Sequence, residues 1–240
     1  MKPEVKVFEN IDSLNVAFTN WMREILWKKG QIAIALSGGS TPKALFDYWA
    51  KNYKTEIDWP KVYLFWGDER CVEPTDEESN FKMTKDHLLK HIPIPEKNIF
   101  RIHGEDDPYL EVNRYINVLE NNVELKNHLP AFDILMLGLG EDGHTASIFP
   151  HQIELWDSNG ICVVATHPDT GQKRISLSGK TINNAHHIAF LVTGGTKAEK
   201  VREIIQCDEK TANRYPASKV DPENGELIWF LDKKAAKLLD

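Results

Sequence analysis

The residues of this sequence best suited to chemistry are a histidine and the glycines and carboxylates that precede it. Residues 138–147 read Gly-Leu-Gly-Glu-Asp-Gly-His-Thr-Ala-Ser and directly follow an apolar run. The ordinary pKa of a histidine is about 6.5, so His144 can accept and return a proton at neutral pH. Asp142 is close enough to orient that ring or a water molecule, while Gly140 and Gly143 let backbone amides approach a substrate. We interpret this loop as a proton-transfer site; the alternative is a histidine that only caps the next turn.

The spacing of Gly138, Gly140 and Gly143 also matches the G-x-G-x-x-G pattern of dinucleotide-binding loops. That pattern needs an acidic residue about 20 positions later to hold the ribose. Apolar residues 161–165 stand there instead, and Pro150 ends any helix that could follow the turn. We therefore expect no nicotinamide cofactor. We expect no metal ion either, because the sequence has no H-E-x-x-H motif and no zinc-type Cys/His spacing.

A second glycine-containing loop follows another apolar run. Residues 37–42 read Ser-Gly-Gly-Ser-Thr-Pro, in which Gly38 and Gly39 permit a tight turn and Ser40 or Thr41 can cap a following helix. Amide donors at the start of a helix attract anions, and phosphate is their usual ligand. We favour a phosphate site over a plain strand-to-helix turn, for which one glycine would usually suffice. The loop lacks the G-x-x-x-x-G-K-[ST] spacing of nucleoside-triphosphate sites.

A third polar loop, Gly-Asp-Glu-Arg at residues 67–70, follows the apolar run 62–66. Asp68 and Arg70 could position hydroxyl groups, bind phosphate or take part in proton transfer. They could equally form a salt-bridged turn on the surface, and the residues by themselves leave both interpretations open.

Short apolar runs alternate with longer amphipathic stretches, and this alternation predicts the fold. We expect strands at residues 4–8, 32–36, 62–66, 99–102, 132–137, 161–165, 175–177, 187–192 and 227–231. We expect helices at residues 11–29, 42–51, 79–90, 108–127 and 196–205, and a last one from Asp232. Apolar strands separated by helices indicate an α/β fold, a mainly parallel open sheet with helices on both faces. Because ligands of such sheets bind beyond the carboxyl ends of the strands, the polar loops should meet there.

Composition excludes several classes of function. Lys and Arg number 29 and Asp and Glu 36, a formal net charge of −7, and no basic stripe suggests a nucleic acid or a membrane as partner. The longest strongly apolar stretch, residues 132–139, is far shorter than the roughly 20 residues of a membrane span. The three cysteines are widely spaced, and no secretory signal is evident. We expect a reduced, cytoplasmic protein whose residues 1–240 form a single domain, because no linker or repeat divides them.

Taken together, the loops resemble the signature segments of the 6-phosphogluconolactonases, within the glucosamine-6-phosphate isomerase/deaminase superfamily. The matching segments are residues 36–42, 66–70, 78–80, 88–89, 137–150, 174–178, 195–198, 216–218 and 229–236. The deaminase branch of that superfamily has a catalytic glutamate five residues after the histidine. Here Phe149 occupies that place and cannot transfer protons, so the resemblance favours the lactonases. The family often has Lys-Pro-Pro before its arginine, whereas residues 167–173 differ and offer Lys173 as a replacement charge.

The resemblance implies a Rossmann-like, glucosamine-6-phosphate deaminase-like fold and hydrolysis of 6-phospho-D-glucono-1,5-lactone, the second step of the oxidative pentose phosphate pathway. It implies a phosphosugar lactone as the small-molecule partner, with no cofactor, metal or protein partner. The implied catalytic residues are His144, as general base, Asp142 and Asp68. The implied substrate-binding residues are Gly38, Gly39, Ser40, Thr41, Arg70, Asn80, Gly140, Gly143, Arg174 and Lys197. Amides of the 138–143 loop would stabilise the oxyanion. The alternatives are a glucosamine-6-phosphate deaminase or isomerase and a sugar-phosphate-binding sensor domain.

Overall fold

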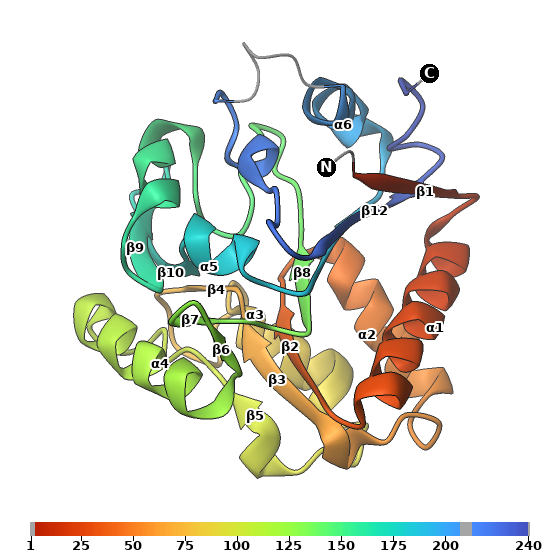
Figure 1. Ribbon diagram of the computed structural model, residues 1–240, viewed down its shortest axis with the longest axis horizontal. Coiled ribbons are helices and arrows are strands. Elements are labelled where there is room, and N and C mark those ends of the chain that lie inside the picture. Colours follow the sequence, from red (N-terminus) through yellow and green to blue (C-terminus); the bar gives the residue numbers. More distant parts are fainter. Residues whose placement is uncertain (1–2, 207–212, 240) are drawn as a thin grey trace.

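The computed structural model describes residues 3–206 and 213–239 and centres on a seven-stranded sheet (Figure 1). The strand order is β1–β12–β11–β8–β2–β3–β5, and each neighbouring pair is parallel. The strands are β1 (Glu4–Phe8), β2 (Ile32–Leu36), β3 (Val62–Trp66), β5 (Ile99–Phe100), β8 (Ile134–Leu137), β11 (His187–Val192) and β12 (Glu226–Asp232). The predicted fold class is confirmed.

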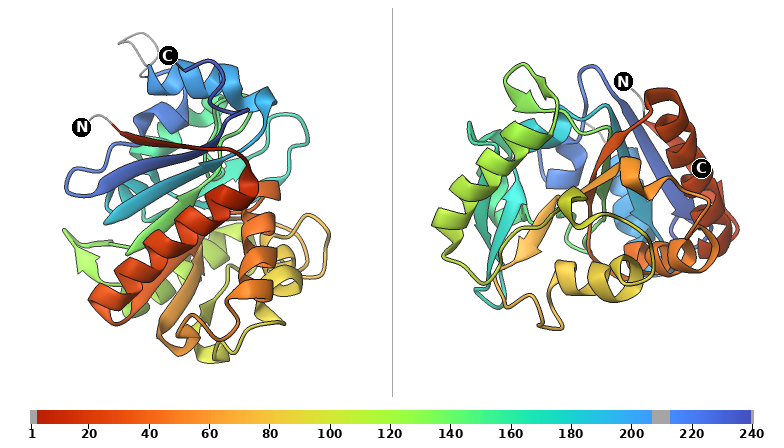
Figure 2. Two further views of the ribbon diagram at one scale, coloured as in Figure 1. Left: turned by 90° about the vertical axis from the view of Figure 1, so that its right-hand side faces the viewer. Right: turned by 90° about the horizontal axis from the view of Figure 1, so that it is seen from below.

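Helices and a second, smaller sheet cover the two faces of the main sheet. In Figure 1, α1 (Ile11–Lys29) and α2 (Ser40–Asn52) lie on one side, and α4 (Pro108–Asn122) and α5 (Gly179–Asn183) lie on the other. The left view of Figure 2 shows α1 lying over one face of the sheet. All four residues of β8 are buried, as expected of a central strand covered on both faces.

The first helix has clear start and stop signals in the sequence. Asn10 caps its N-terminus in a reciprocal pair with Ser13, and the Asn10 side chain accepts the Ser13 N–H at 3.1 Å. Gly30 ends it at φ +81°, a left-handed conformation in which its N–H donates to Leu26 O at 2.8 Å. These caps explain why the predicted range 11–29 is confirmed.

The second sheet is antiparallel, with the order β4 (Asp68–Arg70), β10 (Lys173–Leu177) and β9 (Cys162–Thr166). Its strands were expected in the parallel sheet or, for residues 68–70, in a loop, and both expectations are wrong. The reason is chain length: the connection between β9 and β10 is too short for a parallel crossover, which needs about a dozen residues. Residues 68–70 pair with β10 across this sheet and become a strand.

Three predicted helices differ from the structure. The helix expected at 79–90 is α3 (Asn80–Thr84) followed by a π-helical turn, Lys85–Leu89. The one expected at 108–127 ends at Asn122, and the hairpin of β6 (Leu125–Lys126) and β7 (Leu129–Pro130) follows it. The helix expected from Asp232 does not form, because β12 extends through Asp232, and only turns follow.

The helix predicted at 196–205 is largely α6 (Ala198–Ile205), preceded by a 3₁₀ turn at Gly195–Lys197. The core contains packed aromatic rings as well as aliphatic side chains: the rings of Phe190 on β11 and Trp229 on β12 stack with centroids 4.0 Å apart. Within residues 3–206 and 213–239, no helix has the length and apolar character needed to cross a bilayer.

Candidate active site

A cavity of about 370 Å³ opens at the carboxyl ends of β2, β3 and β8. It is lined by Ser37, Gly38, Gly39, Asp68, Arg70, Asn80, Gly138, Leu139, Gly140, Glu141, His144, Ala146, Arg174 and Lys197. Strands β2 and β8 are neighbours, but the chain leaves β2 toward β3 and leaves β8 toward β11, on the opposite side. The cavity therefore lies at a switch point of the sheet, where α/β folds bind their ligands.

His144 lines this cavity and forms a hydrogen-bonded pair with Asp142, which lies outside the lining. The His144 Nδ1 lies 2.6 Å from Asp142 Oδ1, and the same oxygen accepts the His144 backbone N–H at 3.1 Å. Burial acts to raise the pKa of Asp142, but these hydrogen bonds and the nearby imidazole outweigh burial and hold it at about 2. An ionised Asp142 can only accept, so the proton of a neutral His144 sits on Nδ1 and leaves a lone pair on Nε2. An imidazole held in this way can accept a proton at Nε2.

The glycine loop brings the backbone against the imidazole. A Cβ on Gly140 would lie 2.1 Å from His144 Nδ1, so a side chain there would displace the ring. The Gly140 N–H donates to His144 O at 2.9 Å, and the Gly143 N–H donates to Gly140 O at 3.1 Å. Gly143 has φ +88°, and a Cβ there would lie 2.4 Å from Tyr215. The amides of Gly140 and Gly143 thus serve the loop itself, and Gly143 shapes the loop without lining the cavity.

Asp68 belongs to a buried network that connects the two sheets. Its Oδ2 accepts from Ser147 Oγ at 2.6 Å, and Asn80 Nδ2 donates to its backbone oxygen at 3.0 Å and to Oδ1 at 3.4 Å. All three residues are nearly inaccessible to solvent. The hydrogen bond that orients His144 therefore comes from Asp142, and Asp68 is held by other partners.

Two arginines stand side by side on the second sheet. Arg70 on β4 is directly opposite Arg174 on β10, and both line the cavity. Burial, with the neighbouring Arg70 as the next cause, lowers the pKa of Arg174. Each Nε is buried and has no hydrogen-bond partner among the described residues. Like charges opposite each other on paired strands are destabilising, so an anion between them would stabilise this arrangement.

The Gly38–Gly39 turn forms another wall of the cavity. Gly39 has φ +102° and precedes α2, which begins at Ser40 without a side-chain cap. The predicted capping by Ser40 or Thr41 is therefore wrong: Ser40 is exposed, and Thr41 Oγ1 lies 2.8 Å from Thr193 Oγ1. Neither residue lines the cavity. Ser40 and Thr41 are the first two residues of α2, which follows this turn.

One buried aromatic ring contacts both the histidine and an arginine of the cavity. The Phe149 ring centroid lies 4.8 Å from that of His144, and the Arg174 guanidinium lies 5.8 Å from the Phe149 centroid. The same ring contacts His151 at 5.9 Å and His167 at 5.3 Å. A phenyl ring in these positions limits the movement of the imidazole and has no proton to give.

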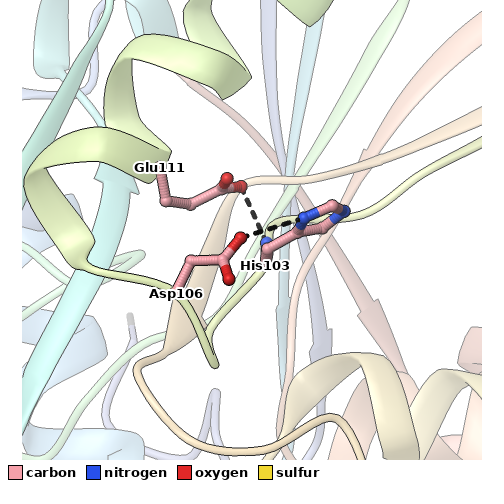
Figure 3. Close-up of side chains that lie close together, drawn as sticks. All are labelled: His103, Asp106 and Glu111. Carbon is pink, nitrogen blue, oxygen red and sulfur yellow. Dashed lines mark hydrogen bonds and ion pairs between the residues drawn. The ribbon is translucent and has the colours of Figure 1, made fainter.

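His103, Asp106 and Glu111 form a cluster whose candidate ligand atoms all lie within 4.8 Å of one another (Figure 3). The Glu111 carboxylate is already engaged by three protein donors, His103 N at 2.7 Å and two nitrogens of Arg114 at 2.6 and 2.7 Å. This arrangement anchors the start of α4, and we assign no metal to it.

The structure brings nine of the expected site residues to one cavity: Gly38, Gly39, Asp68, Arg70, Asn80, Gly140, His144, Arg174 and Lys197. Asp142 stands behind the imidazole, and Lys173 points away to Thr166 Oγ1 at 2.9 Å, outside the cavity lining. Five other lining residues were not among the expected site residues: Ser37, Gly138, Leu139, Glu141 and Ala146. Of these, Glu141 lies 3.8 Å from Lys197, and Ala146 has φ +49°. The charge of Glu141 was a signal for the former; no pattern marks an alanine for the left-handed conformation.

Comparison with known proteins agrees with this geometry. The family model of glucosamine-6-phosphate isomerases/6-phosphogluconolactonase matches residues 8–229. The chain is 50% identical over 182 residues to 6-phosphogluconolactonase of Treponema pallidum, covering 76% of this chain and 73% of that protein. It is 45% identical over 211 residues to the Haemophilus influenzae 6-phosphogluconolactonase, covering 87% and 88%.

Solved structures agree as well. The 6-phosphogluconolactonase from Trypanosoma brucei superimposes with a TM-score of 0.88 at 28% identity, covering 100% of this chain and 99% of that one. A monomeric glucosamine-6-phosphate deaminase, at 21% identity and a TM-score of 0.83, shares the fold over 98% of this chain and 99% of its own. The chain therefore belongs to the glucosamine-6-phosphate isomerase/6-phosphogluconolactonase family.

Proposed function

We propose that this protein is a 6-phosphogluconolactonase, which hydrolyses 6-phospho-D-glucono-1,5-lactone to 6-phosphogluconate in the oxidative pentose phosphate pathway. The observation that carries the proposal is the His144–Asp142 pair beside a cavity that also holds two facing arginines. A base and an anion site in one cavity suit a substrate with an ester at one end and a phosphate at the other. The relatives named 6-phosphogluconolactonase support this choice.

The phosphate would bind between the Gly38–Gly39 turn and the guanidiniums of Arg70 and Arg174. Both arginines line the cavity with buried, unpartnered Nε atoms, and Arg is suited to bidentate phosphate contacts. Lys197 lies at the same cavity and would add a single positive charge. A bound dianion would offset the repulsion between the two guanidiniums. The pairing of β4 with β10 places these charges opposite each other and would therefore favour phosphate binding.

At the ester, His144 Nε2 would take a proton from water, and the resulting hydroxide would attack the lactone carbonyl carbon. The bond from that carbon to the ring oxygen then breaks, and the imidazolium returns its proton to the leaving ring oxygen. The new carboxylic acid loses its proton to solvent. A lactone is an activated ester, so this route needs no covalent nucleophile. Because the amides of Gly140 and Gly143 are engaged within the loop, oxyanion stabilisation falls to other amides of residues 138–142.

Phe149 argues against the deaminase alternative. The resemblance places a catalytic glutamate of the deaminase branch at this position, and here the phenyl ring packs 4.8 Å from the His144 ring. Ring opening of an amino sugar would lack a proton-transfer group at that point. A sensor domain would need the phosphate contacts but not the oriented imidazole.

We further infer that the chain acts as a single domain in the cytoplasm. One apolar cluster includes residues from Leu14 on α1 to Ala236 after β12, which supports a single folding unit. Cys71 and Cys162 are free thiols, which supports a reducing compartment.

The proposal is tested by a lactonase assay with the spontaneous hydrolysis rate subtracted. We expect turnover of 6-phosphogluconolactone well above that rate and no release of ammonia from glucosamine 6-phosphate. Ammonia release, or lactone loss at the spontaneous rate, would contradict the proposal.

A further inference from the structure

Glu69 is a buried carboxylate next to the cavity that the proposed mechanism does not use. It lies on β4 between Asp68 and Arg70 and is 2% exposed. Successive residues of a strand point to opposite faces, so Glu69 points away from the cavity that its two neighbours line.

Four donors converge on this one carboxylate. Its Oε1 accepts the N–H groups of Asn80 at 2.7 Å and of Arg70 at 2.8 Å. Its Oε2 accepts the Phe81 N–H at 2.7 Å and Ser79 Oγ at 3.2 Å. Three of these donors belong to one short segment, so Glu69 attaches residues 79–81 to β4.

The attached segment places Asn80 against both neighbouring walls of the cavity. Asn80 Nδ2 donates to the backbone oxygen of Asp68 at 3.0 Å, and a Cβ on Gly38 would lie 1.9 Å from Asn80 Oδ1. Asn80 therefore fills the space between the Gly38 turn and Asp68. The Arg70 guanidinium also donates to the backbone oxygen of Glu78, so consecutive β4 residues hold this segment.

Glu69 is held in place at an energetic cost. Burial raises its pKa to about 7, although the three backbone N–H groups act to lower it. Buried carboxylates with perturbed pKa values concentrate at functional sites, but some only hold a fold together. Glu111 is such a structural case: it is 1% exposed, accepts a backbone N–H and anchors the start of α4 away from the cavity.

We propose that Glu69 is a positioning residue of the active site, which acts through Asn80 to fix the distance between the Gly38 turn and Asp68. This inference rests on the proposed lactonase function. It makes the glutamate of the Gly-Asp-Glu-Arg segment a part of the site that never touches substrate. It also explains why Asp68, Glu69 and Arg70 are adjacent. Asp68 and Arg70 line the cavity, and Glu69 between them holds residues 79–81 beside it.

The test compares Glu69→Gln with the matched variant Glu111→Gln. Both replace one buried carboxylate by an amide of the same shape, and both should lower the urea midpoint of unfolding. We expect Glu69→Gln to lower kcat/KM for the lactone about tenfold or more, while Glu111→Gln stays within about twofold of the wild type. In an Asn80→Ala background, Glu69→Gln should change kcat/KM by less than about twofold, because the two residues act through one contact.

Amide hydrogen exchange provides a measurement that does not depend on turnover. We expect the Asn80 and Phe81 amides to exchange faster in Glu69→Gln and at the wild-type rate in Glu111→Gln. Unchanged exchange, equal kcat/KM losses in both variants, or a full Glu69→Gln loss in the Asn80→Ala background would each overturn the positioning role. A wild-type protein without lactonase activity would instead overturn the proposed function, and exchange would still decide whether Glu69 holds the segment.

Discussion

Two cavities of this protein are each lined by one histidine and two arginines. The candidate site has His144 with Arg70 and Arg174, and a cavity of about 440 Å³ beside β5 has His103 with Arg101 and Arg114. Each histidine is hydrogen-bonded to an aspartate outside the lining, Asp142 in the first case and Asp106 in the second. The second is the larger. Cavity size and residue types therefore do not separate a functional site from an ordinary hollow in this molecule.

The pairing of the arginines does separate them. In the cavity beside β5, Arg101 contacts Glu105 at 2.6 and 2.8 Å, and Arg114 contacts Glu111 through two nitrogens. In the candidate site, the guanidiniums of Arg70 and Arg174 have each other as neighbours, and the described residues place neither in an ion pair with a carboxylate. Guanidiniums that form no ion pair with a carboxylate of the protein indicate a place for an anionic ligand.

Replacing the histidines of the two cavities should give the largest difference in turnover. His144→Ala should lower kcat by roughly 10²–10⁴-fold, because it removes the proposed general base. It should leave the affinity for 6-phosphogluconate, measured by calorimetry, nearly unchanged. The matched variant His103→Ala should keep wild-type kcat. A similar loss in both variants would mean that His144 has a structural role only.

We expect the next largest loss of turnover at Gly140, where the loop backbone approaches the imidazole. Gly140→Ala would place a Cβ 2.1 Å from His144 Nδ1, so the ring would have to move. A displacement of about 1 Å in a catalytic group can lower the rate about 10²-fold, so kcat should fall by that order. Single-turnover kinetics would measure it, with unfolding by urea as the control for folding. Wild-type kcat would show that the imidazole position is not critical.

The arginines should separate binding from turnover. Arg174→Ala should raise KM about 10- to 100-fold with little change in kcat, since a hydrogen bond to a charged group contributes about 1.5–3 kcal/mol. Arg101→Ala, its counterpart beside β5, should change KM by less than about twofold. Steady-state kinetics of both variants would decide, and a fall in kcat alone for Arg174→Ala would remove the phosphate assignment.

The smallest expected effect is on stability in acid, and it should be similar in the candidate site and in the cavity beside β5. The pKa of Asp142 and that of Glu105 both lie at about 2, below their ordinary values of 3.8 and 4.5. Carboxyls with lowered pKa values stabilise the fold above those ordinary values, and this stabilisation is lost as the pH falls toward 2. Urea unfolding should therefore show that the free energy of unfolding decreases less between pH 5 and pH 2 in Asp142→Asn and in Glu105→Gln than in the wild type. Only Asp142→Asn should also lower kcat; a loss in both would contradict the comparison.

The sequence predicted the parallel sheet and most of the cavity for a simple physical reason. Buried strands such as 32–36 and 134–137 are apolar throughout, and the loops after them carry glycines and polar or charged residues. It did not predict the second sheet, because the pairing of residues 68–70 with β10 depends on contacts between segments far apart in the chain. Nor could it show that Phe149 packs on the imidazole or that Glu69 holds residues 79–81, since both depend on side-chain direction in the folded chain.

The division of the site between two sheets has a consequence for substrate size. Arg70 and Arg174 stand on the antiparallel sheet, whereas His144 follows a strand of the parallel one, and the Ser147–Asp68 hydrogen bond ties the two together. We expect the distance between the proposed anion-binding and proton-transfer groups to be set by the way the two sheets pack against each other. A phosphorylated lactone one carbon shorter is then expected to be a poorer substrate, because its ester and its phosphate lie closer together.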